Sequence, residues 1–288
     1  MSGFITTRAQ NQYGKQSNSK YFNFLHHFIK FVCKDNYFCG MKNRLLQFIA
    51  NTPSTNKLLS EMIHDSSENG NPVPPFFALH TDFQSEGRGM GSNSWFSDRG
   101  RNILVSYYFK PNLPASRQFL FNQYFALSTL AFIQKFLPKA LIKWPNDIYV
   151  DGKKIAGILI EHTVSGDRLQ HTIAGIGINI NQDHFPDDIP HPTSLLLETG
   201  REHDVNELLE AYWQTLYDHF PECDLSHEEN LKKQYISNLY QFNENHPYLI
   251  HDHRTEARIT DLDEYGRLVL HDRNGERFVC GFKEVVFI

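Results

Sequence analysis

A glycine-rich stretch carries the clearest chemical signal in this sequence of 288 residues. Residues 87–95 hold three glycines and two serines, so their backbone can wrap closely around a ligand with its amide groups pointing inward. Arg88 adds a fixed positive charge suited to a carboxylate or a phosphate, and Trp95 adds a flat apolar wall. Because glycine-rich loops are common, this stretch indicates a ligand site only in combination with other motifs.

Two later segments supply that combination. Residues 143–147 read Lys-Trp-Pro-Asn-Asp, and residues 153–159 read Lys-Lys-Ile-Ala-Gly-Ile-Leu. A carboxylate that attacks the α-phosphate of a nucleotide brings two anions together, and fixed cations and amide donors must offset the repulsion. Lysines beside a glycine-rich loop provide such groups. The three segments together favour the activation of a small carboxylic acid with a nucleotide.

The hydrophobic pattern places these motifs on strands and on the loops that connect them. We expect helices from residue 52 or 54 to residue 64 and over residues 116–137, 204–220 and 228–239, and strands over residues 45–50, 76–80, 102–109, 141–144, 148–150, 154–162 and 169–179. The glycine-rich stretch then falls in a loop over residues 81–101 between two strands. A loop of this length without periodicity indicates a functional role.

The C-terminal part follows a different pattern. After His246-Pro247 the helices end, and short strands are expected over residues 257–260, 267–271, 277–281 and 284–288. Four or five short strands in about forty residues favour a small barrel. We therefore expect a larger domain over residues 41–243 and a barrel over residues 244–288.

Residues 1–40 form an atypical N-terminal extension. Residues 1–34 contain five basic residues and no acidic one, and aromatic residues crowd the stretch 21–38. Two interpretations stay open. The extension is a tail outside the working protein, with Met41 as the true start, or residues 21–34 form an ordered helix.

Composition excludes several classes of function. A formal net charge of −5 argues against a general nucleic-acid-binding surface. The four cysteines form no Cys-x-x-Cys pair, which disfavours zinc and dithiol chemistry, and we assign no metal ligands. No apolar run approaches the ~20 residues that span a bilayer. We expect a cytoplasmic protein without membrane or nucleic-acid partners.

The motifs and their order are similar to those of one known family. The chain resembles biotin–protein ligases, also called biotin–[acetyl-CoA carboxylase] ligases, over about residues 45–288. The segments that carry the resemblance are Ser54-Thr55-Asn56, Gln84-x-x-Gly87-Arg88-Gly89, Trp95, Lys143-Trp144-Pro145-Asn146-Asp147, Lys154-x-Ala156-Gly157-Ile158-Leu159 and residues 175–181. The resemblance implies an α/β (α+β) fold: a mixed central β-sheet flanked by helices, similar to class II aminoacyl-tRNA synthetases, followed by a small SH3-like barrel.

The resemblance also implies a ligase that forms a carbon–nitrogen bond in two steps. Biotin and ATP with Mg²⁺ give biotinyl-5′-AMP and pyrophosphate, and a lysine of a biotin carboxyl carrier protein, of acetyl-CoA carboxylase or a related carboxylase, then takes the biotin. Two alternatives stay open: a lipoate or octanoate ligase or transferase of the same fold, and a biotin sensor without catalysis. The strand edges near the glycine-rich loop could pair in a homodimer, although nothing in the sequence requires one.

Site residues follow from the motif match. The resemblance assigns biotin binding to Ser54, Thr55, Asn56, Gln84, Arg88, Gly89, Met90 and Lys154, catalysis to Lys154, Arg88, Asp147 and Lys143, and nucleotide binding to Gly87, Trp95, Asn146 and Asn179. Ser54 can also serve as a simple helix cap. Asp147 either orients or deprotonates the incoming amine, or forms a structural ion pair with Lys143.

Two residues depart from the family pattern of the glycine-rich loop. Met90 stands where the family often has a second basic residue, and Ser92 stands where a glycine is common. Because a cation at position 90 would attract the phosphate of the adenylate, Met90 puts the retention of the intermediate in doubt.

Overall fold

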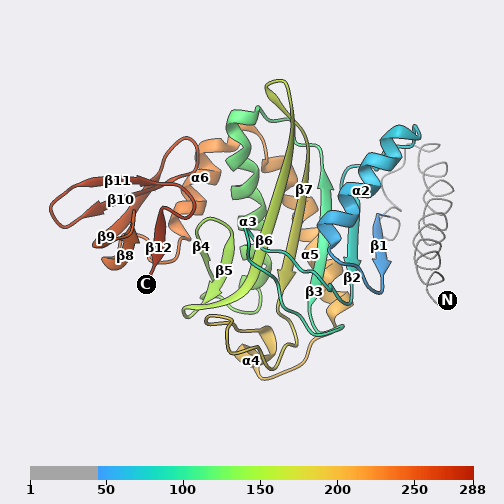
Figure 1. Ribbon diagram of the computed structural model, residues 1–288, viewed down its shortest axis with the longest axis horizontal. Helices are drawn as coiled ribbons and strands as arrows, with labels where there is room; N and C mark the ends of the chain where they lie inside the picture. The colour runs from blue at the N-terminus through green and yellow to red at the C-terminus, as the bar shows by residue number, and fades with distance from the viewer. Residues whose placement is uncertain (1–44) are drawn as a thin grey trace, which may run out of the picture.

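The computed structural model describes residues 45–288, so both interpretations of residues 1–40 lie outside the described part of the chain. Its centre is a seven-stranded sheet (Figure 1). The strand order is β1 (Leu46–Ile49), β2 (Ala78–Thr81), β3 (Ile103–Phe109), β7 (Arg168–Ile178), β6 (Lys153–Ser165), β5 (Asp147–Val150) and β4 (Leu141–Lys143). The pair β1 and β2 is parallel and the other neighbours are antiparallel, which confirms the predicted mixed sheet.

Helices cover both faces of this sheet (Figure 1). On one face lies α2 (Thr55–Glu68), and on the other lie α3 (Gln118–Gln134) and α5 (Val205–His219). Successive side chains of a strand point to opposite faces. Tyr107 of β3 therefore packs against α3 and α5, whereas Tyr108 packs on the side of α2. Two-sided covering explains why all seven residues of β3 are buried.

The helices α5 and α2 differ in whether a side chain caps their first turn. Asp204 caps α5, because its Oδ1 accepts hydrogen bonds from the amides of Asn206 and Glu207. Ser54 occupies the N-cap position of α2, but its side chain makes no capping hydrogen bond. The α2 helix also continues to Glu68, beyond the predicted end at residue 64.

A second sheet follows α6 (Glu228–Ser237). It is antiparallel and has five strands in the order β11 (Arg277–Cys280), β10 (Leu268–Asp272), β9 (His253–Leu262), β8 (His246–Ile250) and β12 (Val285–Phe287). The prediction missed β8, which begins at His246-Pro247, because proline is rare in strands except at their starts and edges. The predicted boundary between residues 243 and 244 stays a prediction.

Gly266, in the turn between β9 and β10, joins the two sheets. Its carbonyl accepts a hydrogen bond of 2.9 Å from Nε1 of Trp144. Its backbone is left-handed, with φ of +80°, and a Cβ at this position would collide with the ring of Phe119 on α3. The turn is therefore fixed between α3 and the connection from β4 to β5.

The remaining elements are short. They are α4 (Leu195–Thr199) and three 3₁₀ turns, η3 (Ala115–Arg117), η4 (Phe220–Glu222) and η5 (Leu225–His227). Across residues 45–288, no helix combines the length and the apolar character required to cross a membrane.

Candidate functional site

A cavity of about 350 Å³ brings the sequence motifs together. Its volume lies in the usual range for small-molecule sites. Every predicted site residue except two lines it: Ser54, Thr55, Asn56, Gln84, Arg88, Gly89, Met90, Trp95, Lys143, Asn146, Asp147 and Lys154. The exceptions are Gly87, which packs against the backbone of Trp95, and Asn179, whose side-chain amide donates to the carbonyl of Thr193. A nucleotide contact by either residue stays a prediction.

The glycine-rich stretch is a small hairpin rather than an irregular loop. The amide of Gly89 donates to the carbonyl of Asn93 at 2.7 Å, and the amide of Trp95 donates to the carbonyl of Gly87 at 2.9 Å. Gly91 lies at the tip in a left-handed conformation, with φ of +69°. We call residues 87–95 the glycine hairpin.

Two glycines of the central sheet make room for Trp95. Gly157 of β6 and Gly177 of β7 are register partners, so both lack a side chain at the same place on the same face. A Cβ on either residue would collide with the indole ring. The glycine pair therefore seats Trp95, which places the end of the hairpin on the sheet.

Polar side chains from three elements form one end of the cavity. Oε1 of Gln84 accepts hydrogen bonds from the amide and the hydroxyl of Thr55, at 2.8 and 3.1 Å. The fully buried Ser106 of β3 lies 2.7 Å from Oγ1 of Thr55 and 2.5 Å from Oδ1 of Asn56. Gly175 leaves the space that Asn56 fills. These contacts fix the orientation of the first residues of α2.

Glu161 of β6 connects this polar end to the glycine hairpin. One of its carboxylate oxygens accepts from Arg88 at 2.5 Å, and the other accepts from Nδ2 of Asn56 at 2.7 Å. Arg88 is therefore held beside Asn56. Neither Glu161 nor Ser106 was predicted from the sequence. Two features of the sequence could have indicated these residues. Ser106 interrupts an otherwise apolar strand, and Glu161 lies two positions beyond Leu159, on the same face of its strand.

Charged groups form the other end of the cavity. The ammonium of Lys154 lies 2.7 Å from Oδ2 of Asp147 and 5.6 Å from the centre of the Trp95 ring. Lys143 lies over the rings of Tyr149 and Phe287, at 4.6 and 5.0 Å from their centres. Asp147 therefore pairs with Lys154, and the ion pair with Lys143 that the sequence left open does not form.

Burial and two neighbouring charges shift the pKa of Lys143. Burial lowers the pKa of its ammonium, the nearby carboxylate of Asp147 raises it, and the charge of Lys154 lowers it further. Three cationic side chains line the cavity, but Arg88 pairs with Glu161 and Lys154 pairs with Asp147. Within residues 45–288 no carboxylate lies at ion-pair distance from Lys143, and its charge suits an anionic ligand.

The C-terminal sheet supplies one wall of the cavity, which was not predicted from the sequence. Phe282, Val285, Val286 and Phe287 line the cavity. The contact of Lys143 with Phe287 joins this wall to the central sheet. Nothing in the local sequence pattern marks these residues, because their role depends on how the second sheet packs against the first.

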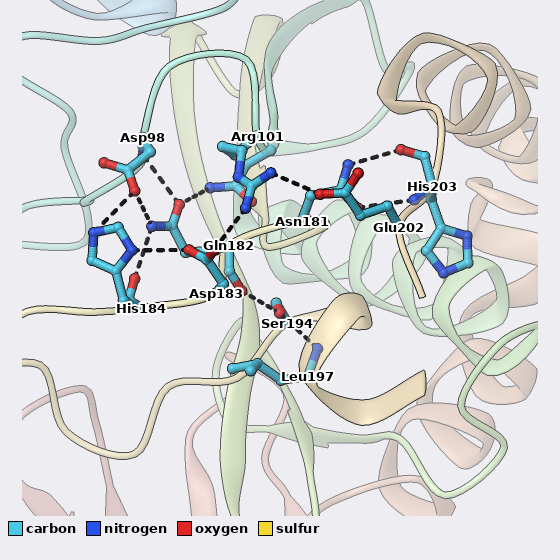
Figure 2. A network of polar contacts seen from close by, with 11 residues as sticks. Asp98, Arg101, Asn181, Gln182, Asp183, His184, Ser194, Leu197, Glu202 and His203 are labelled. Carbon is cyan, nitrogen blue, oxygen red and sulfur yellow. Dashed lines mark hydrogen bonds and ion pairs between the residues drawn. The ribbon is translucent and has the colours of Figure 1, made fainter. Parts of the chain in front are cut away.

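A polar network holds the segment that follows the glycine hairpin (Figure 2). Gln182 donates to Oδ2 of Asp98 and accepts from the side-chain amide of Asn102, both at 2.7 Å. His184 contacts Asp183 at 2.9 Å and Asp98 at 3.3 Å. The hydrogen bond to Asp183 and the charge of Asp98 raise the pKa of the His184 imidazole, and the hydrogen bond from His184 lowers the pKa of the Asp183 carboxyl.

Known proteins match the same part of the chain. Residues 49–179, which span the motif segments from Ser54 to Asn179, match the family described as the biotin/lipoate A/B protein ligase family. This stretch of the chain is similar to a domain of this family. The bifunctional ligase/repressor BirA of Bacillus spizizenii is 36% identical over 158 residues, which cover 52% of this chain and 46% of that protein. The biotin–[acetyl-CoA-carboxylase] ligase of Paracoccus denitrificans is 37% identical over 87 residues, 27% of this chain and 36% of that protein.

A solved structure extends the likeness to most of the fold. The biotin protein ligase of Aquifex aeolicus, in complex with biotin and ATP, superposes with a TM-score of 0.68 at 23% identity. The superposition covers 84% of this chain and 98% of that protein. It supports the predicted fold of a mixed sheet flanked by helices with a second C-terminal sheet. By sequence, the matched stretch spans less than half the length of the first relatives, 46% and 45%.

Proposed function

We propose that this protein is a biotin–protein ligase, which forms biotinyl-5′-AMP from biotin and ATP and transfers the biotin to a lysine of a carrier domain. One observation carries the proposal. A single cavity has hydrogen-bonding side chains and Arg88 at one end, and Lys143, Lys154 and the carboxylate of Asp147 at the other. Such a cavity suits a ligand with a polar ring, an apolar chain and a carboxylate, next to a nucleotide phosphate.

The polar end favours biotin over lipoate. The ureido ring of biotin has one carbonyl and two N–H groups, which can pair with hydroxyls and side-chain amides such as those of Thr55, Asn56 and Gln84. The dithiolane ring of lipoate has no comparable groups, so these polar side chains would lose hydrogen bonds to water without replacing them. The resulting penalty discriminates against lipoate.

The charged end suits the first reaction step. Lys154 can face both the carboxylate of biotin and the α-phosphate, where its charge offsets the repulsion between the two anions. Trp95 beside it provides an apolar surface that limits the access of water to the mixed anhydride. The indole Nε1 is buried without an acceptor among residues 45–288, so it can donate to a ligand.

We infer that Mg²⁺ enters together with ATP. Magnesium is usually held by substrate phosphates and by one or two carboxylates, with water completing its ligands. The cavity provides the carboxylate of Asp147 and the side-chain oxygen of Asn146 beside the cations that would face the phosphates. This set of donors fits a metal carried by the nucleotide.

The second step needs a neutral amine on the carrier lysine, because a protonated amine cannot attack the acyl carbon. Asp147 can accept the proton or orient the amine once its partner Lys154 faces the adenylate. By analogy with the relative from Paracoccus denitrificans, the proposed carrier is the biotin carboxyl carrier protein of acetyl-CoA carboxylase. The cytoplasmic location and the homodimer stay predictions.

The decisive experiment follows labelled biotin onto a purified carrier domain. We expect label on the carrier only when ATP and Mg²⁺ are both present, and pyrophosphate release from biotin, ATP and Mg²⁺ even without the carrier. Labelled lipoate in place of biotin tests the first alternative, and biotin binding without pyrophosphate release would instead identify a sensor. Biotin at ~100 times its dissociation constant should add about 2.7 kcal/mol to the free energy of unfolding, and lipoate should not.

A further inference from the structure

A lysine of the C-terminal sheet lies at the tip of the glycine hairpin. A Cβ built on Gly91 would be 3.3 Å from Nζ and 3.4 Å from Cε of Lys283, so the end of the lysine packs directly over this glycine. Within residues 45–288 no carboxylate lies at ion-pair distance from Lys283, and its ammonium lies 6.0 Å from the centre of the Phe282 ring. The charge is therefore available to a ligand at the hairpin.

The backbone at Lys283 is unusual for a lysine. The residue lies in the turn between β11 and β12, which is closed by a hydrogen bond of 3.1 Å from the amide of Glu284 to the carbonyl of Gly281. Its φ is +72°, in the left-handed region where turns normally use glycine or asparagine. A lysine in this position is strained, and residues held in such conformations cluster at functional sites.

The cavity lies next to this contact. Met90 and Phe282, the immediate neighbours of Gly91 and Lys283 in sequence, both line it. Met90 offers only apolar contact from the side of the hairpin. A cation at this edge of the cavity therefore comes from the facing turn of the second sheet, at Lys283.

We propose that Lys283 retains the adenylate: its ammonium attracts the phosphate of biotinyl-5′-AMP and holds the closed glycine hairpin against the C-terminal sheet. This inference rests on the proposed function. Lys283 takes no part in bond formation or proton transfer. It lowers the rate at which the hairpin opens and the intermediate leaves before a carrier lysine arrives.

The test measures the release of labelled biotinyl-5′-AMP after it has formed on the full chain, with unlabelled biotin added as a chase. Lys283→Asn removes the charge with a residue that tolerates the left-handed backbone, and Lys283→Arg keeps the charge. At low ionic strength we expect Lys283→Asn to release the intermediate roughly three- to tenfold faster than the original protein, and Lys283→Arg to release it at close to the original rate. High salt should shrink the difference, because salt screens exposed charges.

A second variant tests whether charge or turn shape is responsible. Met90→Arg in the Lys283→Asn background restores a cation from the hairpin side and should slow release again. Equal release by Lys283→Asn and the original protein would overturn the inference, and so would fast release by Lys283→Arg, which would point to the shape of the turn. If the original protein makes no adenylate from biotin and Mg-ATP, the proposed function fails first, and the inference about Lys283 fails with it.

Discussion

The ammonium of Lys154 and the carboxylate of Asp147 form an ion pair of 2.7 Å inside the cavity. The main cation proposed for the reaction is therefore already matched by an anion from the neighbouring strand. A ligand carboxylate must share or replace this partner, and Asp147 becomes free to accept a proton when Lys154 turns to the ligand. The pair thus links the two steps of the proposed reaction through one contact.

We predict that Lys154→Ala removes most adenylate synthesis and leaves part of the biotin binding. The charge contributes most when carboxylate and phosphate approach, and the loss of one such contact typically costs ~3–4 kcal/mol, or 10² to 10³ in rate. Pyrophosphate release measures the effect. Lys153→Ala is the matched control, because Lys153 lies next in sequence but pairs with Glu198 outside the cavity. Similar losses in both variants would contradict the assigned role.

Gly177→Ala should displace Trp95. The backbone of Gly177 is not left-handed, so the added methyl group acts only through its collision with the indole ring. We expect a loss of roughly 1–3 kcal/mol in the free energy of unfolding, as is usual for overpacking. Urea unfolding measures this loss, and Trp95→Ala added to Gly177→Ala should recover part of it. No recovery in the double variant would mean that the methyl group strains the sheet itself.

Ser106→Ala should weaken biotin binding and leave ATP binding unchanged. The hydroxyl is fully buried and lies beside both Thr55 and Asn56, so its removal leaves polar groups without partners at a typical cost of about 1–3 kcal/mol. Calorimetric titration should give a dissociation constant for biotin that is roughly tenfold higher. Ser165→Ala, at an exposed position in the hairpin between β6 and β7, should change neither constant. An equal loss for biotin and ATP would indicate general unfolding.

His184 and Asp183, which contact each other in the polar network after the glycine hairpin, should make stability depend on pH in opposite directions. The pKa of His184 is raised above 6.5, so the stabilisation from its contacts is complete below about pH 6.5 and is lost as pH rises through the raised value. The pKa of Asp183 is lowered below 3.8, so its stabilisation is present above that pH and is lost as pH falls through the lowered value.

The difference in unfolding free energy between the original protein and His184→Gln measures the first effect. We expect the difference to shrink as pH rises above 6.5, because the imidazole, whose pKa is raised, then loses its proton. Urea unfolding at several pH values gives the curve. A difference that grows with pH would show that His184 acts as a neutral hydrogen-bonding residue.

Local sequence patterns predicted most of the central sheet. The strands that carry the motifs, β5, β6 and β7, lie within a few residues of the predicted ranges, because their alternating apolar residues and flanking turns mark them clearly. The pattern failed at β8, because no strand was expected before residue 257, and at the end of α2, where packing on the sheet extends the helix to Glu68.

Only part of the site could be predicted from the sequence. Motif residues such as Gln84 and Lys154 could be named because the resemblance covers them. Ser106 and Glu161 were missed because their roles depend on cross-strand register, which places Ser106 opposite Gly175 and Glu161 opposite Ile173. Contacts between distant segments, such as Lys283 with Gly91, have no local signature at all.

Gly266 restricts how the cavity can open. Its carbonyl holds Trp144, and its missing side chain admits Phe119, so this turn of the second sheet can neither slide nor rotate against the first without losing both contacts. The wall formed by Phe282, Val285, Val286 and Phe287 belongs to the sheet that this turn anchors to the first one. Opening of the cavity must then come from the glycine hairpin, whose tip rests against this wall.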